Sequence, residues 1–353
     1  MSVSEREQAR KKLLQKVAVV AAGLLLLTGI LLIIFYWEGQ QDTFPSITDG
    51  TDGSSGNNRD PNARPIEDGR QTARYNGQWY VMRENIETVL VIGLDTADNT
   101  DPDKHETFEN DARADFLMLL IIDRNNETIR ALHINRDTMA DIPVLGVGGQ
   151  VIGTTNAQLA LAHTYGSGRM DSCINTATAV SVYLYDTPID HYVSLDMAAI
   201  QIVNDAVGGV TLTVLDDFSG IDDSLVKGET VTLMGEHAMR YVRSRGGMED
   251  STNEHRMIRQ RQYLGALHKQ TKDRISSDVG FALGLLLGVS EHLVSDCTIY
   301  ELSDLLQISE QYEFSEIETI AGESIVGDRY MEFYADEDEL QKQIIELFYE
   351  PEQ

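Results

Sequence analysis

The chain has little cysteine and little positive charge. Its 353 residues include only two cysteines, Cys173 and Cys297, and 28 Lys and Arg against 57 Asp and Glu, a formal net charge of -29. One widely spaced cysteine pair leaves open whether the two form a disulfide or remain buried thiols. No Cys and His residues have the spacing of a zinc site. The acidity argues against nucleic acid as the main partner, because phosphate backbones are bound by a basic face.

Positive charge is concentrated in one short segment, MRYVRSRGGMEDSTNEHRMIRQRQ. Guanidinium groups remain charged and grip phosphate through paired hydrogen bonds, so such a cluster in an acidic chain indicates a polyphosphate site. The alternative is a solvated helix whose arginines pair with nearby carboxylates. The six arginines of the segment are Arg240, Arg243, Arg245, Arg256, Arg259 and Arg261.

The N-terminal region predicts a membrane anchor. The uncharged apolar run from Val17 to Tyr36 has about the length that a helix needs to cross a bilayer. Basic residues precede it and acidic residues follow it, which keeps the N-terminus in the cytoplasm. A cleaved signal peptide is the alternative, but the run is longer than such a segment and lacks an A-x-A-like cleavage site.

The rest of the chain is predicted to consist of a linker and one domain. Few apolar residues follow the anchor up to about Arg74, which predicts a flexible linker, and no internal repeat or second linker divides what remains. We therefore predict a cytoplasmic tail (1–16), a transmembrane helix (17–37), a flexible acidic linker (38–74) and one extracellular domain (75–353).

Apolar runs in the predicted domain alternate between strand and helix patterns, which indicates an α/β fold. The mixed order favours a three-layer α-β-α sandwich around a central mixed sheet. Predicted strands are Thr88–Leu94, Phe116–Asp123, Thr128–Asn135, 189–195, 210–215 and Ile317–Ala321. Predicted helices are Asn156–Gly166, Ser172–Asp186 with Ser172 as N-cap, 197–208, Asn253–Lys269, Gly280–Leu293 and Glu337–Tyr349.

Charged residues stand at the ends of three predicted strands. Asp95 follows the first strand, Arg136 and Asp137 follow the third, and Arg113 and Asp115 stand at the start of the second. Ligands of open sheets bind at the carboxyl ends of strands, so these residues share one rim only if the second strand runs antiparallel. Carboxylates beside arginines suit a magnesium pyrophosphate site. The alternative for each aspartate is a turn or a helix cap.

The arginine-rich segment would supply a second wall of this site. On a helix, Arg256, Arg259 and Gln260 are spaced i, i+3 and i+4 and share one face. Arg243 and Arg245 share a face if RYVRSR is extended and diverge if it is helical, and the sequence leaves both open. Together these groups would neutralise the charge of a leaving pyrophosphate.

Eight blocks in register resemble the LytR-CpsA-Psr family of bacterial envelope proteins. They are VLVIGLDT, ARADFLMLLIID, LHINRDTMADIP, NAQLALAHTYG, PIDHYVSLD, NDAVGGVTLTV, GEHAMRYVRSR and HRMIRQRQYLGAL. The resemblance implies an enzyme, a phosphotransferase. It would move a glycopolymer such as teichoic acid or capsule from a polyprenyl-pyrophosphate carrier to a peptidoglycan hydroxyl, with Mg²⁺, at the cell membrane of a Gram-positive-type bacterium.

The resemblance also implies roles for single residues. Asp95 and Asp115 would hold the metal, and Asp115 is a candidate to accept the proton of the acceptor hydroxyl. The catalytic group would be Asp95, Arg113, Asp115 and Arg136. The residues that would bind pyrophosphate are Arg113, Arg136, Arg243, Arg245, Arg256, Arg259 and Gln260.

The sequence departs from the family pattern at several positions. Thr154 replaces a lysine, Asn135 replaces the proline before Arg136, and His255 replaces the glycine before Arg256. The acidic insertion at 97–110 is either a lid or a solvated loop. The apolar stretch Gly280–Val289 either lines a pocket for the lipid tail or is an ordinary core helix.

Three other functions would use the same features. In the first, the domain binds polyprenyl phosphate without turning it over and acts as a carrier or sensor. Asp95 and Asp115 favour an enzyme over this alternative. Hydrolysis of the pyrophosphate linkage would need the same residues as transfer. Some family members are named transcriptional attenuators, but the predicted cytoplasmic tail is too short for a DNA-binding fold.

Overall fold

The computed structural model describes residues 70–95, 110–244, 253–277, 281–327 and 330–352. The predicted tail, transmembrane helix and most of the linker therefore lie outside the described residues, as do Arg245 and nearly all of the acidic insertion. Within the described ranges, no helix is both long enough and apolar enough to cross a bilayer. The described residues belong to one compact unit.

Among the described residues, the central sheet contains six strands, and it is mixed, as the sequence predicts. The strands are β3 (Ile86–Leu94), β4 (Ala114–Asp123), β5 (Thr128–Ile134), β8 (His191–Leu195), β11 (Leu293–Ser295) and β12 (Glu313–Thr319). Their order is β11-β8-β3-β4-β5-β12. β3, β4 and β5 are antiparallel neighbours, β8 is parallel to β3, and β12 is parallel to β5.

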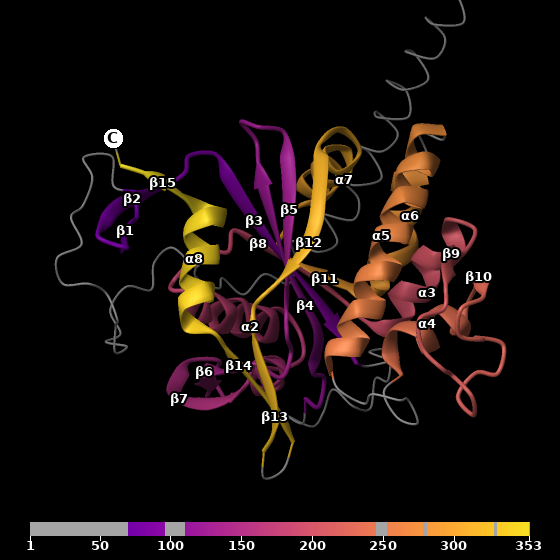
Figure 1. The fold of residues 1–353 in the computed structure, drawn as a ribbon, viewed down its shortest axis with the longest axis horizontal. Coiled ribbons are helices and arrows are strands. Elements are labelled where there is room, and N and C mark those ends of the chain that lie inside the picture. The colour runs from indigo at the N-terminus through magenta and orange to yellow at the C-terminus, as the bar shows by residue number, and fades with distance from the viewer. Residues whose placement is uncertain (1–69, 96–109, 245–252, 278–280, 328–329, 353) are drawn as a thin grey trace, which may run out of the picture. The chain divides into compact units, whose positions relative to one another are not determined.

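Helices pack on both faces of this sheet (Figure 1). Because side chains alternate along a strand, Leu90 and Ile92 of β3 enter the larger core, whereas Val89 enters a smaller core on the opposite face. The larger core includes α2 (Met170–Tyr183) and α8 (Glu337–Phe348), and the smaller one includes α7 (Ile299–Gln311). Burial on both faces explains why the strand sequences are almost continuously apolar.

A further core lies beside the edge of the sheet and is built around Phe218, Tyr241 and Tyr263. Its elements are α3 (Met197–Ala206), β9 (Val210–Thr213), β10 (Thr230–Leu233), α4 (Glu236–Arg243), α5 (Asn253–Ser277) and α6 (Phe281–Val289). The remaining elements are β1 (Thr72–Tyr75), β2 (Gln78–Met82), β6 (Met139–Leu145), β7 (Val151–Gln158), β13 (Gly322–Val326), β14 (Met331–Ala335), β15 (Tyr349–Pro351), and the 3₁₀ helices η4 (Leu159–Tyr165) and η5 (Ser290–His292).

Two predicted helices differ in the structure. The first residues of predicted helix Asn156–Gly166 belong to β7, and the rest form η4. Gln158 explains this, because its side-chain amide donates to Asp137 Oδ1 and to the Met331 carbonyl and holds the chain extended. The helix predicted from Ser172 begins at Met170, and the Ser172 hydroxyl accepts from Gly168 N instead of capping that helix.

The two cysteines are free thiols, so the disulfide alternative was wrong. Cys173 is buried in the larger core, where its Sγ lies 3.9 Å from Nε2 of His163. Cys297 is half-buried in the turn before α7. Burial raises the pKa of the Cys173 thiol to about 12 and that of Cys297 to about 11, so neither is a reactive thiolate near neutral pH.

Two buried histidines make the fold sensitive to acid. Burial lowers the pKa of His133 to about 3 and that of His163 to about 4. Below pH 6.5 the unfolded chain binds protons at both residues that the folded chain does not, so stability is lost as pH falls from 6.5 toward these values. At pH 5 each histidine will cost about 2 kcal/mol of unfolding free energy.

Urea unfolding at pH 7.5 and pH 5.0 tests this prediction. His163→Asn keeps a donor for the Ala112 carbonyl, which lies 2.9 Å from the histidine Nδ1, but it cannot titrate. The stability difference between the two pH values will shrink by about 2 kcal/mol in this variant. An unchanged difference would contradict the prediction.

Candidate active site

The predicted charged residues do meet at one rim of the central sheet. β4 runs antiparallel to β3, so the start of β4 lies beside the end of β3. The backbone amide of Asp95 donates to the Arg113 carbonyl at 3.2 Å, which joins the two strands at this point. β5 in turn runs antiparallel to β4, and Arg136 follows its end at the same rim. The sequence required the second predicted strand to run antiparallel for these residues to share one rim, and β4 does so.

A cavity of about 410 Å³ opens at this rim. Four arginines and two aspartates line it, together with Ser244, the residue after α4. The structure thus gathers six of the predicted site residues around one space, from three strand ends and two helices. The six are Asp95, Arg113, Asp115, Arg136, Arg243 and Arg256.

Asp115 lies at the centre of the charges. Its Oδ1 forms an ion pair with the Arg136 guanidinium, and its Oδ2 lies 3.2 Å from Nη1 of Arg256. Arg256 also donates from Nη2 to the Asp115 carbonyl at 3.2 Å. Both arginines are buried, with 7% and 3% of their side chains exposed. One carboxylate therefore orients two desolvated guanidinium groups.

Asp95 and Arg243 form the more open side of the cavity. Nη2 of Arg243 lies 2.8 Å from Oδ1 of Asp95, and the arginine side chain is 53% exposed. Oδ1 of Asp95 is itself buried, so this ion pair is partly shielded from solvent. α4 continues to Arg243, so the segment is helical up to that residue. Arg245 lies outside the described residues.

Two asparagines that sequence reasoning did not assign to the site hold Arg256 in place. Asn253, the first residue of α5, accepts from Nη2 of Arg256 and donates to Oδ1 of Asn135, both at 2.5 Å. The same Asn135 oxygen accepts from the Asp137 amide at 3.0 Å. Asn135 replaces a proline of the family pattern, and this departure was the sequence signal that could have indicated its role in the site. The hydrogen bond between Asn135 and Asn253 joins the end of β5 to the start of α5.

Arg259 and Gln260 do not line the cavity. They lie behind it, where they bind backbone carbonyls at the end of α4. Arg259 donates from Nε to the Tyr241 carbonyl at 3.1 Å, and Gln260 donates to the Val242 carbonyl at 3.3 Å. Arg259 also forms an ion pair of 2.5 Å with Asp216. The shared helical face predicted for these residues exists, but only Arg256 reaches the cavity from it.

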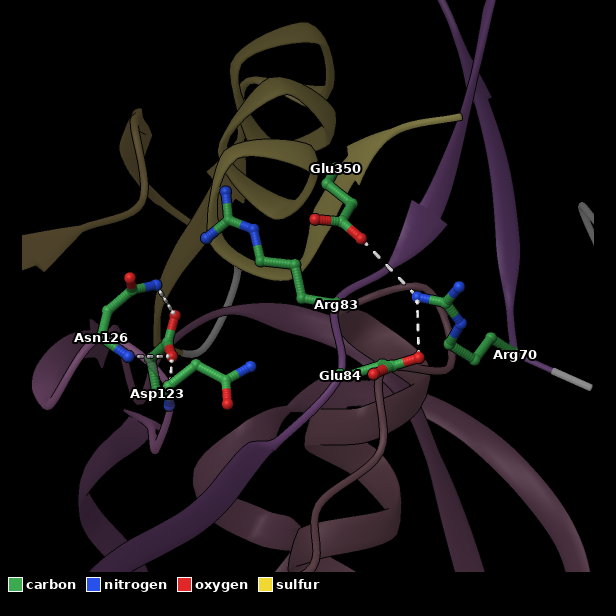
Figure 2. A pocket seen from close by; sticks show the side chains of 7 residues that line it. Arg70, Arg83, Glu84, Asp123, Asn126 and Glu350 are labelled. Atoms are coloured by element: carbon green, nitrogen blue, oxygen red, sulfur yellow. Dashed lines mark hydrogen bonds and ion pairs between the residues drawn. The ribbon is translucent and has the colours of Figure 1, made fainter. Parts of the chain in front are cut away.

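A second cavity, of about 250 Å³, contains none of the predicted site residues. Its charges are largely paired, because Arg70 lies 3.8 Å from Glu84 and 3.6 Å from Glu350. Figure 2 shows that Arg83 points away from this group. Asp123 is held by Asn126. Carboxylates outnumber arginines in this cavity, whereas arginines outnumber carboxylates at the rim, so the rim cavity is the better candidate for an anion site.

The donor set at the rim is compatible with a hard divalent cation. Mg²⁺ prefers one or two carboxylates together with water and phosphate oxygens. Asp95 and Asp115 are the two carboxylates that line the cavity. Oδ1 of Asp95 is paired with the half-exposed Arg243, and a carboxylate has further lone pairs that can bind a cation.

Residues 53–347 match the LytR_cpsA_psr family. The chain belongs to this family. It is 28% identical over 233 residues to the polyisoprenyl-teichoic acid–peptidoglycan teichoic acid transferase TagU of Halalkalibacterium halodurans, covering 66% of this chain and 68% of that protein. It is 31% identical over 219 residues to the corresponding transferase TagV of Bacillus subtilis, covering 59% and 51%.

Solved structures share the fold. The crystal structure of Bacillus subtilis TagV superposes with a TM-score of 0.55 at 25% identity, covering 75% of this chain and 97% of that one. A structure of TagT bound to LIIa-WTA superposes with a TM-score of 0.56 at 24% identity, covering 75% and 90%. The mixed sheet with packed helices is therefore the architecture of this LytR-CpsA-Psr protein.

Proposed function

We propose that this LytR-CpsA-Psr protein transfers a phosphate-linked glycopolymer, of the teichoic acid class, from a polyprenyl-pyrophosphate carrier to a hydroxyl of peptidoglycan. The observation that carries the proposal is the rim cavity, which places four arginines around two aspartates. The names of the relatives TagU and TagV, both teichoic acid transferases, support the choice of substrate.

The arginines suit this reaction because pyrophosphate must be bound and then cleaved. Arg136 and Arg256 are buried and held by Asp115, so their charges need no reorganisation when a phosphate enters. Arg243 is half-exposed and is placed to bind the substrate at the mouth. Such preorganised cations stabilise the charge that develops on the departing prenyl phosphate.

The bond changes are those of a phosphoryl transfer. The acceptor hydroxyl oxygen forms a bond to the phosphorus that carries the glycan. The bond from this phosphorus to the bridging oxygen breaks, and prenyl phosphate leaves with the electron pair. The hydroxyl proton passes to a carboxylate at the rim, with Asp115 as the candidate. Bound Mg²⁺, held by Asp95 and Asp115, would supply electrostatic neutralisation of the pyrophosphate oxygens.

We also propose where in the cell the enzyme acts. The apolar run at 17–36 would anchor it in the cell membrane, with the domain outside, where a lipid-linked glycan and peptidoglycan both occur. The strongly acidic composition is consistent with a solvated extracellular domain and with no nucleic-acid partner.

The test uses the full-length protein in detergent micelles with Mg²⁺, a short-chain prenyl-pyrophosphate saccharide and peptidoglycan fragments. Prenyl phosphate release and glycan capture are followed together. We expect both to depend on Mg²⁺ and to fall by about 10²-fold in Asp95→Asn, which loses a metal ligand and the partner of Arg243. The exposed Asp141→Asn is the matched control and should retain full activity.

The outcomes separate the competing functions. Release with capture establishes the transferase, and release without capture indicates a pyrophosphate hydrolase. Binding of the lipid without release, across several saccharides, indicates a carrier or sensor. Full activity in Asp95→Asn would remove this rim from the mechanism.

A further inference from the structure

A second group of chemically reactive side chains gathers at the other end of the sheet. His191 opens β8, and Asp296 and Cys297 directly follow β11. β11 and β8 pair antiparallel, which brings these distant parts of the sequence together. β8 is parallel to β3, so its first residue lies at the opposite end of the sheet from Asp95. This group is therefore separate from the rim cavity.

The ligating atoms of the three side chains all lie within 4.8 Å of one another. Nδ1 of His191 is 3.7 Å from Oδ1 of Asp296, and that oxygen is 4.0 Å from Sγ of Cys297. Zinc bonds of about 2.0 Å to nitrogen or oxygen and about 2.3 Å to sulfur place tetrahedral ligands about 3.3 to 3.5 Å apart. Small side-chain rotations would close the remaining difference.

The histidine nitrogen supplies an independent observation. Nδ1 of His191 is buried and has no hydrogen-bond partner among the described residues. The 3.7 Å separation from Asp296 is too long for a hydrogen bond. A buried imidazole nitrogen without a partner is costly, and it points to a group that completes its coordination.

Hydrogen bonds from side chains to backbone groups fix the turn that carries the other two ligands. Oδ1 of Asp296 accepts from the Tyr192 amide at 2.8 Å, next to His191. The Ser295 hydroxyl donates to the Tyr192 carbonyl at 2.6 Å and accepts from the Cys297 amide at 3.0 Å. The three ligands are therefore held close together by β8 and the β11–α7 turn, as a preorganised site requires.

We propose that His191, Asp296 and Cys297 bind a zinc-class divalent metal ion. A thiolate and an imidazole favour such ions over Mg²⁺, which prefers an all-oxygen set. On binding, the Cys297 thiol loses its proton to solvent and its sulfur bonds the metal. Three protein ligands leave a fourth position for water. The bound ion ties the turn before α7 to the start of β8.

Cobalt(II) reports on this site directly, because thiolate ligation gives an intense near-ultraviolet charge-transfer absorption. Full-length protein in detergent, first stripped with a chelator, is titrated with Co²⁺ and then with Zn²⁺. We expect one cobalt per chain with thiolate absorption, displaced by Zn²⁺ but not by Mg²⁺. Cys297→Ser should abolish the absorption, and His191→Asn should weaken Co²⁺ binding by at least about 10-fold.

Two matched controls locate the metal. Cys173→Ser removes the other thiol, and Asp95→Asn removes a rim carboxylate, so both should keep the absorption. Loss of the absorption in either control, or its persistence in Cys297→Ser, would place the metal elsewhere and overturn the proposal. Saturation of the unaltered protein with Co²⁺ without any thiolate absorption would overturn it regardless of how the variants fold.

Discussion

Replacing Asp115 by asparagine will lower the rate of glycan transfer by about 10²- to 10³-fold. The carboxylate binds the guanidinium groups of Arg136 and Arg256 at once, and all three side chains are largely buried. Asparagine keeps the shape but removes the charge, and its amide N–H₂ would face a guanidinium group. The variant thus loses a proposed metal ligand together with the anion that orients two arginines.

The measurement compares turnover and substrate affinity in Asp115→Asn and in Asp141→Asn, whose exposed carboxylate lies outside the cavity. Thermal unfolding of each variant shows whether the domain stays folded at the assay temperature. Turnover in Asp115→Asn within about threefold of the unaltered protein, with the fold intact, would mean that Asp115 serves the structure and not the reaction.

Most of the rim could be predicted from the sequence because strand ends are easy to locate. The long apolar runs define where β3, β4 and β5 stop, and charged residues at those points must lie near the sheet edge. The one missing fact was the direction of β4, and an antiparallel strand places Asp95 and Asp115 together. Predicting the rim therefore required only the local sequence pattern and the direction of one strand, β4.

Helical periodicity was less informative for the arginine-rich segment. It correctly places Arg256 and Arg259 on one face of α5, but three residues advance a helix by about 4.5 Å. That advance moves Arg259 past the rim and against the carbonyls at the end of α4. Which neighbour each arginine meets depends on how α4 and α5 pack, and no sequence spacing encodes that packing.

Contacts between residues far apart in the sequence could not be predicted either, because they also depend on how the elements pack. Asn135 meets Asn253 only because the end of β5 lies next to the start of α5. His191 meets Asp296 only through the pairing of β8 with β11. Spacing rules for metal sites recognise ligands carried by short motifs, and these ligands belong to none.

Replacing Arg259 by alanine will destabilise the fold by about 3 kcal/mol or more. Only 1% of this side chain is exposed, and it forms an ion pair with Asp216, hydrogen bonds to backbone carbonyls, and a contact over the ring of Phe218. Its removal leaves the largely buried carboxylate of Asp216 with His255, whose Nδ1 is 3.6 Å away. Urea unfolding at pH 7.5 measures the loss. Lys342→Ala, which breaks an exposed pair with Glu339, should cost far less than Arg259→Ala.

The double variant Arg259→Ala, Asp216→Ala separates a structural role from substrate binding. Removing the carboxylate as well avoids an isolated buried charge, so we expect the double variant to regain part of the stability lost in Arg259→Ala. Substrate affinity is then measured well below the unfolding temperature of each protein. If Arg259 supports α4, affinity will recover along with stability, because Arg243 and Ser244 return to the cavity wall. Recovered stability with affinity still lost would instead show that the guanidinium group itself contacts the pyrophosphate.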